Sequence, residues 1–95
     1  MNNYMSLGDA IERFLAKHKL QDKVLIQEVL TDWEKFVGTP IASNTEKVWF
    51  EKGTLFIKVS SPTWRNELNM ARFRLKQMIN QKVNKELVED VRIMM

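Results

Sequence analysis

Apolar residues recur at two spacings along the chain, and the spacing predicts where helices and strands fall. A capping box of Ser6 and Asp9 predicts a first helix over about residues 6–18. Its apolar face consists of Leu7, Ile11, Phe14 and Leu15. A second helix follows and is stopped by Gly38 and Pro40. Its two apolar rows are formed by Leu25, Ile26, Val29, Leu30, Trp33, Phe36 and Val37.

From residue 46 the apolar period changes to two, and Lys52-Gly53 lies where a two-residue hairpin turn needs positive φ. That turn predicts a register, because cross-strand partners keep a constant sum of residue numbers. The predicted pairs are Glu51–Thr54, Phe50–Leu55, Trp49–Phe56, Val48–Ile57 and Lys47–Lys58. One face of the hairpin is therefore an apolar core face, and the other carries Trp49 opposite Phe56, with Lys47 and Lys58 beside them.

Ser61-Pro62 predicts the start of a third helix over about residues 62–83, since proline suits the first helical position. A final strand is predicted over residues 88–95, where apolar and polar residues alternate. The element order is ααββαβ. This order predicts an α+β domain of two layers, with a small three-stranded sheet packed by helices.

The charge of the chain is modest as a whole but is concentrated in one predicted element. Fifteen basic and 12 acidic residues leave a net charge of +3. Between residues 62 and 85, however, six bases accompany the single acid Glu67. Five of these bases define what we call the basic stripe of the third helix: Arg65, Arg72, Arg74, Lys76 and Lys82. A stripe of one sign repels itself, so it favours an anionic partner such as a phosphate backbone over a merely solvated face.

Several kinds of chemistry are not expected. The chain has no cysteine and one histidine, His18, which is interpreted as a polar residue at the C-terminal end of the first helix. We therefore expect no metal site and no cofactor. No phosphate-binding glycine loop or nucleophile motif is present, so we expect no enzyme. Apolar runs are too short for a membrane span, and the N-terminus does not read as a signal peptide, which predicts a cytoplasmic protein.

Several hypotheses for the role of the predicted Trp49–Phe56 pair stay open. Two rings on a sheet, flanked by Lys47 and Lys58, are typical of a surface that stacks single-stranded bases. The same rings could instead pack beneath helices, pair with a second copy in a homodimer, or dock a protein. The basic stripe has an alternative too, since exposed lysine and arginine often only support solubility.

Two separated motifs carry a resemblance to a known family. They are Trp33-x-x-x-Val37-Gly38-x-x-Ile41-x-x-x-Thr45 and Gly53-x-Leu55-x-Ile57-x-Val59-x-Ser61-Pro62-x-Trp64-x-x-Glu67-Leu68. Together they resemble the DciA-like family of bacterial proteins over about residues 5–94. The resemblance implies a fold similar to a K-homology (KH) domain, nucleic-acid binding, and a role as loader or activator of the replicative DNA helicase.

We expect one DciA-like domain over residues 1–95, without the basic C-terminal tail of larger members. The glycines Gly8, Gly38 and Gly53 form no Gly-x-x-Gly pair, so the backbone clamp of a KH domain is not expected. Trp33 and Trp64 lie on apolar helix faces and are expected in the core.

The sequence thus predicts a non-enzymatic accessory protein of DNA replication. It would bind DNA, with single strands favoured, through Lys47, Trp49, Phe56, Lys58 and the basic stripe. The replicative helicase is the partner implied by the resemblance. Two alternatives remain: a protein-interaction adaptor that does not touch nucleic acid, and an RNA-binding module that uses the same surface.

Overall fold

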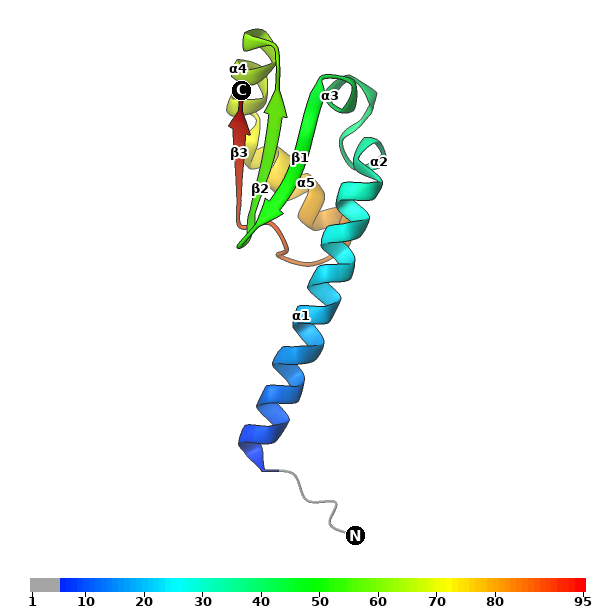
Figure 1. Ribbon diagram of the computed structural model, residues 1–95, viewed down its shortest axis with the longest axis vertical. Coiled ribbons are helices and arrows are strands. Elements are labelled where there is room, and N and C mark those ends of the chain that lie inside the picture. Colours follow the sequence, from blue (N-terminus) through cyan, green and yellow to red (C-terminus); the bar gives the residue numbers. More distant parts are fainter. Residues whose placement is uncertain (1–5) are drawn as a thin grey trace.

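The computed structural model describes residues 6–95 and has an elongated shape of 63 × 20 × 19 Å. A small α+β body lies at one end, and a long helix projects from it (Figure 1). This confirms the predicted fold class. The elements are α1 (Leu7–Thr31), α2 (Trp33–Val37), α3 (Thr39–Ser43), β1 (Thr45–Glu51), β2 (Thr54–Val59), α4 (Pro62–Met70), α5 (Arg72–Val83) and β3 (Asp90–Met94). No helix within residues 6–95 combines the length and the apolar character needed to cross a membrane.

The sheet has the strand order β1-β2-β3, with β1 antiparallel and β3 parallel to the central β2. The hairpin turn is formed by Lys52 and Gly53, with φ of 46° and 83°. Positive φ at both positions matches the twist of the flanking strands. The five predicted cross-strand pairs are all present, and the register shifts only between Thr45 and Lys47. The hairpin prediction is confirmed.

The core lies between one face of this sheet and the helices behind it (Figure 1). Its fully buried side chains are Leu55, Ile57, Val59, Ile79, Val88 and Val91. One polar residue, Asn80, is buried among them, and its side chain donates to the Val88 carbonyl and accepts from the Val88 amide, at 2.9 and 2.8 Å. These bonds hold the segment that leads into β3. Trp33 is buried as expected, and Trp64 packs against the core partly buried.

The first predicted helix and the first part of the second form one continuous helix, α1, so the helix predicted over residues 6–18 does not end there. Ser6 caps its start as expected, accepting from the Asp9 amide at 3.0 Å. No glycine or proline separates the two apolar segments, and the polar residues between them are tolerated in a helix. His18 therefore lies within α1 rather than at a helix end, which corrects the interpretation from sequence.

The break comes later, at Asp32, and is followed by α2 and α3. Gly38, with φ of 88°, ends α2 as predicted. Pro40, by contrast, does not act as a stop, because it occupies the first turn of α3. Proline suits that place, since its missing N–H has no helical partner there.

The third predicted helix is divided into α4 and α5 at Ala71, which has φ of −94° and ψ of 6°. Its start at Ser61-Pro62 is confirmed, with the Ser61 hydroxyl accepting from the Trp64 amide. No glycine or proline marks the break. Leu68 and Leu75, on either side of Ala71, are both buried in the core.

Candidate nucleic-acid interface

No helix within residues 6–95 covers the outer face of the sheet, because these helices pack on the face of Leu55 and Ile57. Side chains alternate between the two faces of a strand, so the remaining β1 and β2 side chains point away from the core. Trp49 and Phe56 form a cross-strand pair on this outer face and are both half-buried. We call Lys47, Trp49, Phe56 and Lys58 the sheet platform. The four residues predicted from the hairpin are thus brought together.

The two rings of the platform stack on each other. Their centroids are 5.2 Å apart and their planes differ by 5°. Two rings lying edge to edge in one plane would overlap at this centroid distance. The two parallel rings therefore form an offset stack, which is a preferred geometry for aromatic pairs. The Lys47 ammonium lies 5.1 Å from the centroid of the Trp49 ring, within cation–π range. Lys47 therefore contacts the ring pair at Trp49.

The third strand adds a cation that the sequence reasoning missed. Arg92 lies opposite Phe56 in the parallel register, and Met94 lies opposite Lys58. The side chain of Arg92 is 64% exposed. Alternation within 90–94 would have placed Arg92 on the polar face. The position of Arg92 beside Phe56, however, follows from the parallel pairing of β3 with β2. No local sequence pattern marks that pairing.

Charge is unevenly distributed along the sheet face. Glu51, Thr54 and Asp90 form the row nearest the hairpin turn, and Lys47 and Lys58 lie two residues further along the strands from the aromatic row. One end of the face is therefore acidic and the other basic. A phosphate backbone would be attracted to the basic end and repelled from the acidic one.

Two ion pairs involve these cations, and both are open to solvent. Lys58 lies 3.8 Å from Glu46, and Arg92 lies 3.6 Å from Asp90. The side chains are 45% to 64% exposed, so each pair contributes little to stability. Such pairs can be exchanged for a phosphate at small cost.

The basic stripe is divided by the break at Ala71. Arg65 lies on α4, whereas the other four bases, Arg72, Arg74, Lys76 and Lys82, lie on α5. Lys82 is engaged within the fold, since its ammonium donates to the carbonyls of Lys35 and Phe36 at 3.2 and 2.8 Å. These carbonyls belong to the last turn of α2, where a cation is favourable.

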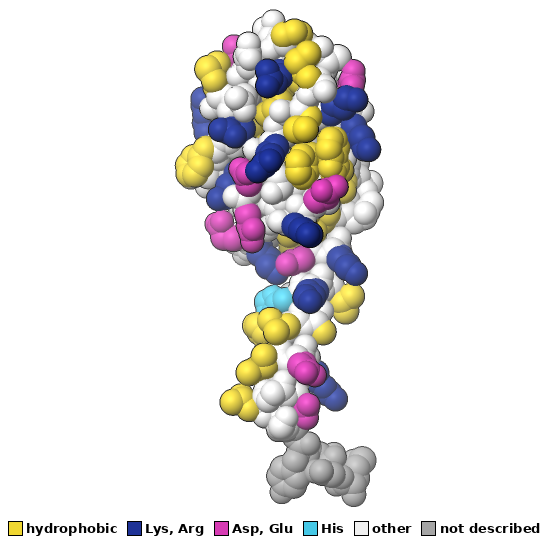
Figure 2. Space-filling model, turned by 60° about the vertical axis from the view of Figure 1, so that its left-hand side comes forward, with side chains coloured by type: hydrophobic (Ala, Val, Ile, Leu, Met, Phe, Trp, Pro, Cys, Tyr) yellow, Lys and Arg dark blue, Asp and Glu magenta, His cyan; other side chains and the backbone are white. Residues whose placement is uncertain are grey.

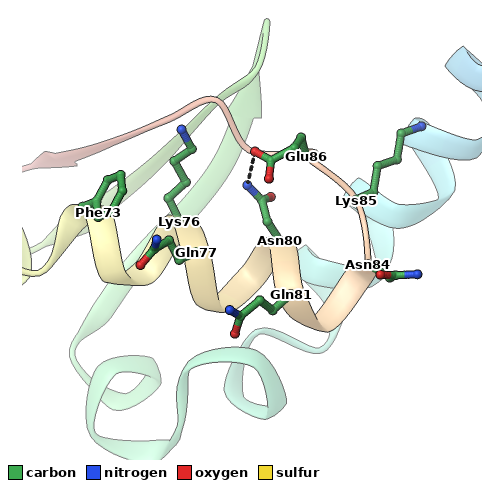
Figure 3. A pocket seen from close by; sticks show the side chains of 8 residues that line it. All are labelled: Phe73, Lys76, Gln77, Asn80, Gln81, Asn84, Lys85 and Glu86. Atoms are coloured by element: carbon green, nitrogen blue, oxygen red, sulfur yellow. Dashed lines mark hydrogen bonds between the residues drawn. The ribbon is translucent and has the colours of Figure 1, made fainter.

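The fold also brings acids to the α5 side. Arg72 and Lys76 line a hollow together with Glu89 and Asp90. Lys76 also lines a neighbouring hollow beside Glu86 (Figure 3). These acids come from the segment after α5 and from the first residue of β3, so a count over residues 62–85 does not reveal them. The stripe is less uniformly positive in space than it is along the chain.

Phe73 is a second feature that the sequence reasoning missed. It is 66% exposed and lies at one end of the hollow shown in Figure 3, next to Lys76 and Gln77. Its sequence neighbours are the stripe arginines Arg72 and Arg74. The sequence does carry a signal for this feature, because Phe73 is the one aromatic residue within the basic segment that forms α5.

The sheet platform and the basic stripe lie on different sides of the body. Helices α4 and α5 cover the core face of the sheet, and the platform lies on the opposite face (Figure 1). Figure 2 shows one face of the body, on which hydrophobic side chains gather close to Lys and Arg side chains. A single straight strand cannot contact both sets at once, so each set is a separate candidate surface.

These features define a small α+β domain that displays an aromatic and basic sheet face. Comparison with protein families is decisive: the chain belongs to the DciA family, described as "Dna[CI] antecedent, DciA", whose model matches residues 6–93. The resemblance drawn from the two motifs is thereby confirmed.

One relative is a "UPF0232 protein" from Corynebacterium glutamicum (strain R), 27% identical over 88 residues. The match covers 93% of this chain and 49% of that relative, so the chain spans about half of the relative's length. No solved structure matches the chain. The likeness to a KH domain accordingly stays a prediction from the resemblance.

Proposed function

We propose that this protein is a non-catalytic accessory protein of DNA replication that binds single-stranded DNA on the outer face of its sheet. The observation that carries the proposal is the stacked Trp49–Phe56 pair on an uncovered sheet face, with Lys47, Lys58 and Arg92 around it. Aromatic rings beside cations are the recurrent means of holding single strands without reading their sequence.

In this proposal a base extends the existing stack at Phe56, on the side of β3. Lys47 already lies over the Trp49 ring, so we assign the ligand to the Phe56 ring, whose neighbour on β3 is Arg92. The backbone phosphates then lie toward Lys47 and Lys58, away from the acidic row near the turn. Stacking of one base contributes about 1–3 kcal/mol.

The basic stripe on α4 and α5 contributes a weaker, purely electrostatic contact. Arg65, Arg72 and Arg74 are exposed and available to phosphates. Lys82 contributes least, because its ammonium is already bonded to two carbonyls. Such contacts would carry no sequence information.

Membership of the DciA family supports a role as loader or activator of the replicative helicase. In this role the protein binds the helicase and the single strand together and performs no chemistry itself. The protein-adaptor and RNA-binding alternatives use the same two rings, so binding measurements separate the three.

The experiment is fluorescence anisotropy of a labelled single-stranded DNA oligonucleotide at low and near-physiological salt, with duplex DNA and RNA as competitors. We expect single-strand binding that weakens as salt rises, since bound cations release counterions from phosphates. A Lys47→Glu/Lys58→Glu variant should bind much more weakly than wild type, whereas a Lys23→Glu variant should bind normally.

Binding that is unaffected by the Lys47→Glu/Lys58→Glu change but lost in Arg72→Glu/Lys76→Glu would assign the single strand to α5 instead. Absence of binding at low salt would contradict the proposal and favour the adaptor. Tighter binding of RNA than DNA would favour the RNA-binding module.

A further inference from the structure

Arg92 lies on the outer face of the sheet, at the side of the ring pair where the bound base is assigned. It is directly opposite Phe56 in the parallel register of β2 and β3, and it alternates along β3 with the buried Val91 and Ile93. Arg92 and Phe56 therefore leave the sheet on the same face. Neighbouring strands lie about 4.8 Å apart, so a base stacked on Phe56 toward β3 would lie beside the Arg92 side chain.

The direction of the Arg92 side chain is set by its neighbour on the same strand. Arg92 Nε lies 3.6 Å from Asp90 Oδ2. The other carboxylate oxygen, Asp90 Oδ1, accepts from the Val91 amide at 2.9 Å, which ties the carboxylate to the backbone of β3. Within residues 6–95 the cation that lies over a ring is Lys47, over Trp49. Arg92 is therefore directed along β3 toward Asp90 and not across the Phe56 ring.

This contact leaves the donors of the guanidinium available. A guanidinium carries five N–H donors in a planar fork. At 3.6 Å the contact with Asp90 is an ion pair and not a hydrogen bond, so it uses none of these donors. It is made through Nε, and the side chain is 64% exposed. The edge that carries the two Nη groups is thus free to donate two parallel hydrogen bonds to a ligand.

A phosphate is a poor ligand for this edge. Arg92 is directed toward the row of Glu51, Thr54 and Asp90, which is the acidic end of the sheet face. Backbone phosphates are repelled from that row and attracted to the basic end. A base carries no net charge, so its edge approaches Arg92 without this repulsion.

We propose that Arg92 donates to the edge of the base stacked on Phe56 and thereby gives the site a preference for guanine. This inference rests on the proposed binding of single-stranded DNA. Stacking alone accepts every base, because every base has a π-face. Guanine adds two neighbouring acceptors, O6 and N7, which match the fork of an arginine, whereas the same edge of adenine combines an acceptor with a donor.

The pyrimidines should bind less tightly than guanine. The corresponding edge of thymine offers one acceptor, O4, and that of cytosine offers a donor. Cytosine does have two neighbouring acceptors elsewhere, O2 and N3. It covers less of the Phe56 ring than a purine does, however, so it should rank second to guanine.

The test is fluorescence anisotropy of the full chain with labelled oligo-dT strands that carry isolated dG, dA or dC residues. The guanines are kept apart so that they do not assemble into quadruplexes. The dG strand should bind about fivefold or more tightly than the dA strand, which is the lower limit for a bidentate contact to the correct base. A strand with 7-deazaguanine in place of guanine lacks the N7 acceptor and should lose most of this advantage.

Arg92→Lys is the decisive variant, because lysine keeps the positive charge but has no planar fork. The preference for dG over dA should fall below about twofold, and the salt dependence of binding should stay as in wild type. Arg13→Lys is the matched control, since Arg13 is an exposed arginine of α1 that lies outside the sheet platform and the basic stripe. It should keep the wild-type preference. Circular dichroism verifies that each variant is folded.

The outcomes separate this inference from the function on which it rests. Equal affinity for the dG and dA strands would overturn the role of Arg92 and leave single-strand binding intact. No binding of any strand would overturn the proposed function, and this inference with it. A dG preference that survives Arg92→Lys, a 7-deazaguanine strand that binds as tightly as the dG strand, or a dC strand that does so would each overturn the assignment of guanine to Arg92.

Discussion

Replacing Trp49 by alanine separates a binding role of the outer sheet face from a structural one. The change removes one ring of the stacked pair and the surface that Lys47 lies against. The proposed base stacks on Phe56, so the change acts by releasing the Phe56 ring from its neighbour, and the loss is at most the full value of one stacking contact, about 1–3 kcal/mol. With about 1.4 kcal/mol for each factor of ten, the dissociation constant for single-stranded DNA should rise by up to roughly 100-fold.

The same change has a smaller effect on folding. The aromatic pair contributes about 0.5–1.5 kcal/mol beyond burial, and the exposed cation–π contact contributes about 0.5–1 kcal/mol. Together they indicate a loss of about 1–2.5 kcal/mol, or roughly 4–20 °C in melting temperature for a domain of this size. By contrast, Leu55→Ala in the fully buried core should cost about 2–5 kcal/mol.

The assay is anisotropy of labelled single-stranded DNA below the melting temperature of every variant, with thermal denaturation followed by circular dichroism. Phe73→Ala is the matched control, because Phe73 is an exposed ring on α5 and not on the sheet. Trp49→Phe should retain most of the affinity. A folded Trp49→Ala variant with wild-type affinity would refute the stacking argument, and a loss of stability equal to that of Leu55→Ala would show that the ring belongs to the core.

Three further predictions concern contacts that hold the fold together, and thermal or urea denaturation measures each. Asn80→Ala should destabilise the protein by about 2–3 kcal/mol, because two buried backbone groups before β3 lose their partners. Lys82→Ala should lower the free energy of unfolding by about 1 kcal/mol, because two carbonyls at the end of α2 lose their hydrogen-bond donor. Arg74→Ala should change the free energy of unfolding by less than about 0.5 kcal/mol. Gly53→Ala should cost about 1–2 kcal/mol, since φ is 83° and a Cβ would lie 2.6 Å from the Glu89 carboxylate. Adding Glu89→Ala should recover only the steric part, so full recovery would contradict the backbone argument.

The hairpin and the helix caps were predictable because their signals are local. Lys52-Gly53 sets the turn, and the turn sets the register over the five paired positions. That register alone places Trp49 beside Phe56 and Lys47 beside Lys58. The sheet platform could therefore be assembled from about a dozen consecutive residues.

Residues that meet across the fold were not predictable in this way. Arg92 joins the aromatic row only because β3 pairs with β2 in parallel, and a parallel connection leaves no turn signal in the sequence. Likewise, Glu89 and Asp90 reach Arg72 only after the segment following α5 has folded back onto the sheet. The basic stripe looked uniform along the chain for this reason.

The sequence by itself determined the α+β class, the hairpin register, the capped helix starts at Ser6 and Ser61, and membership of the DciA family. The tertiary structure decided that α1 is continuous, that the helix after β2 divides at Ala71, and that Lys82 bonds the end of α2. Local patterns act over one or two turns of chain, where propensity and capping dominate. Helix length, helix breaks and distant partners depend on how much apolar surface each arrangement buries, and that quantity exists only once all the elements are in place.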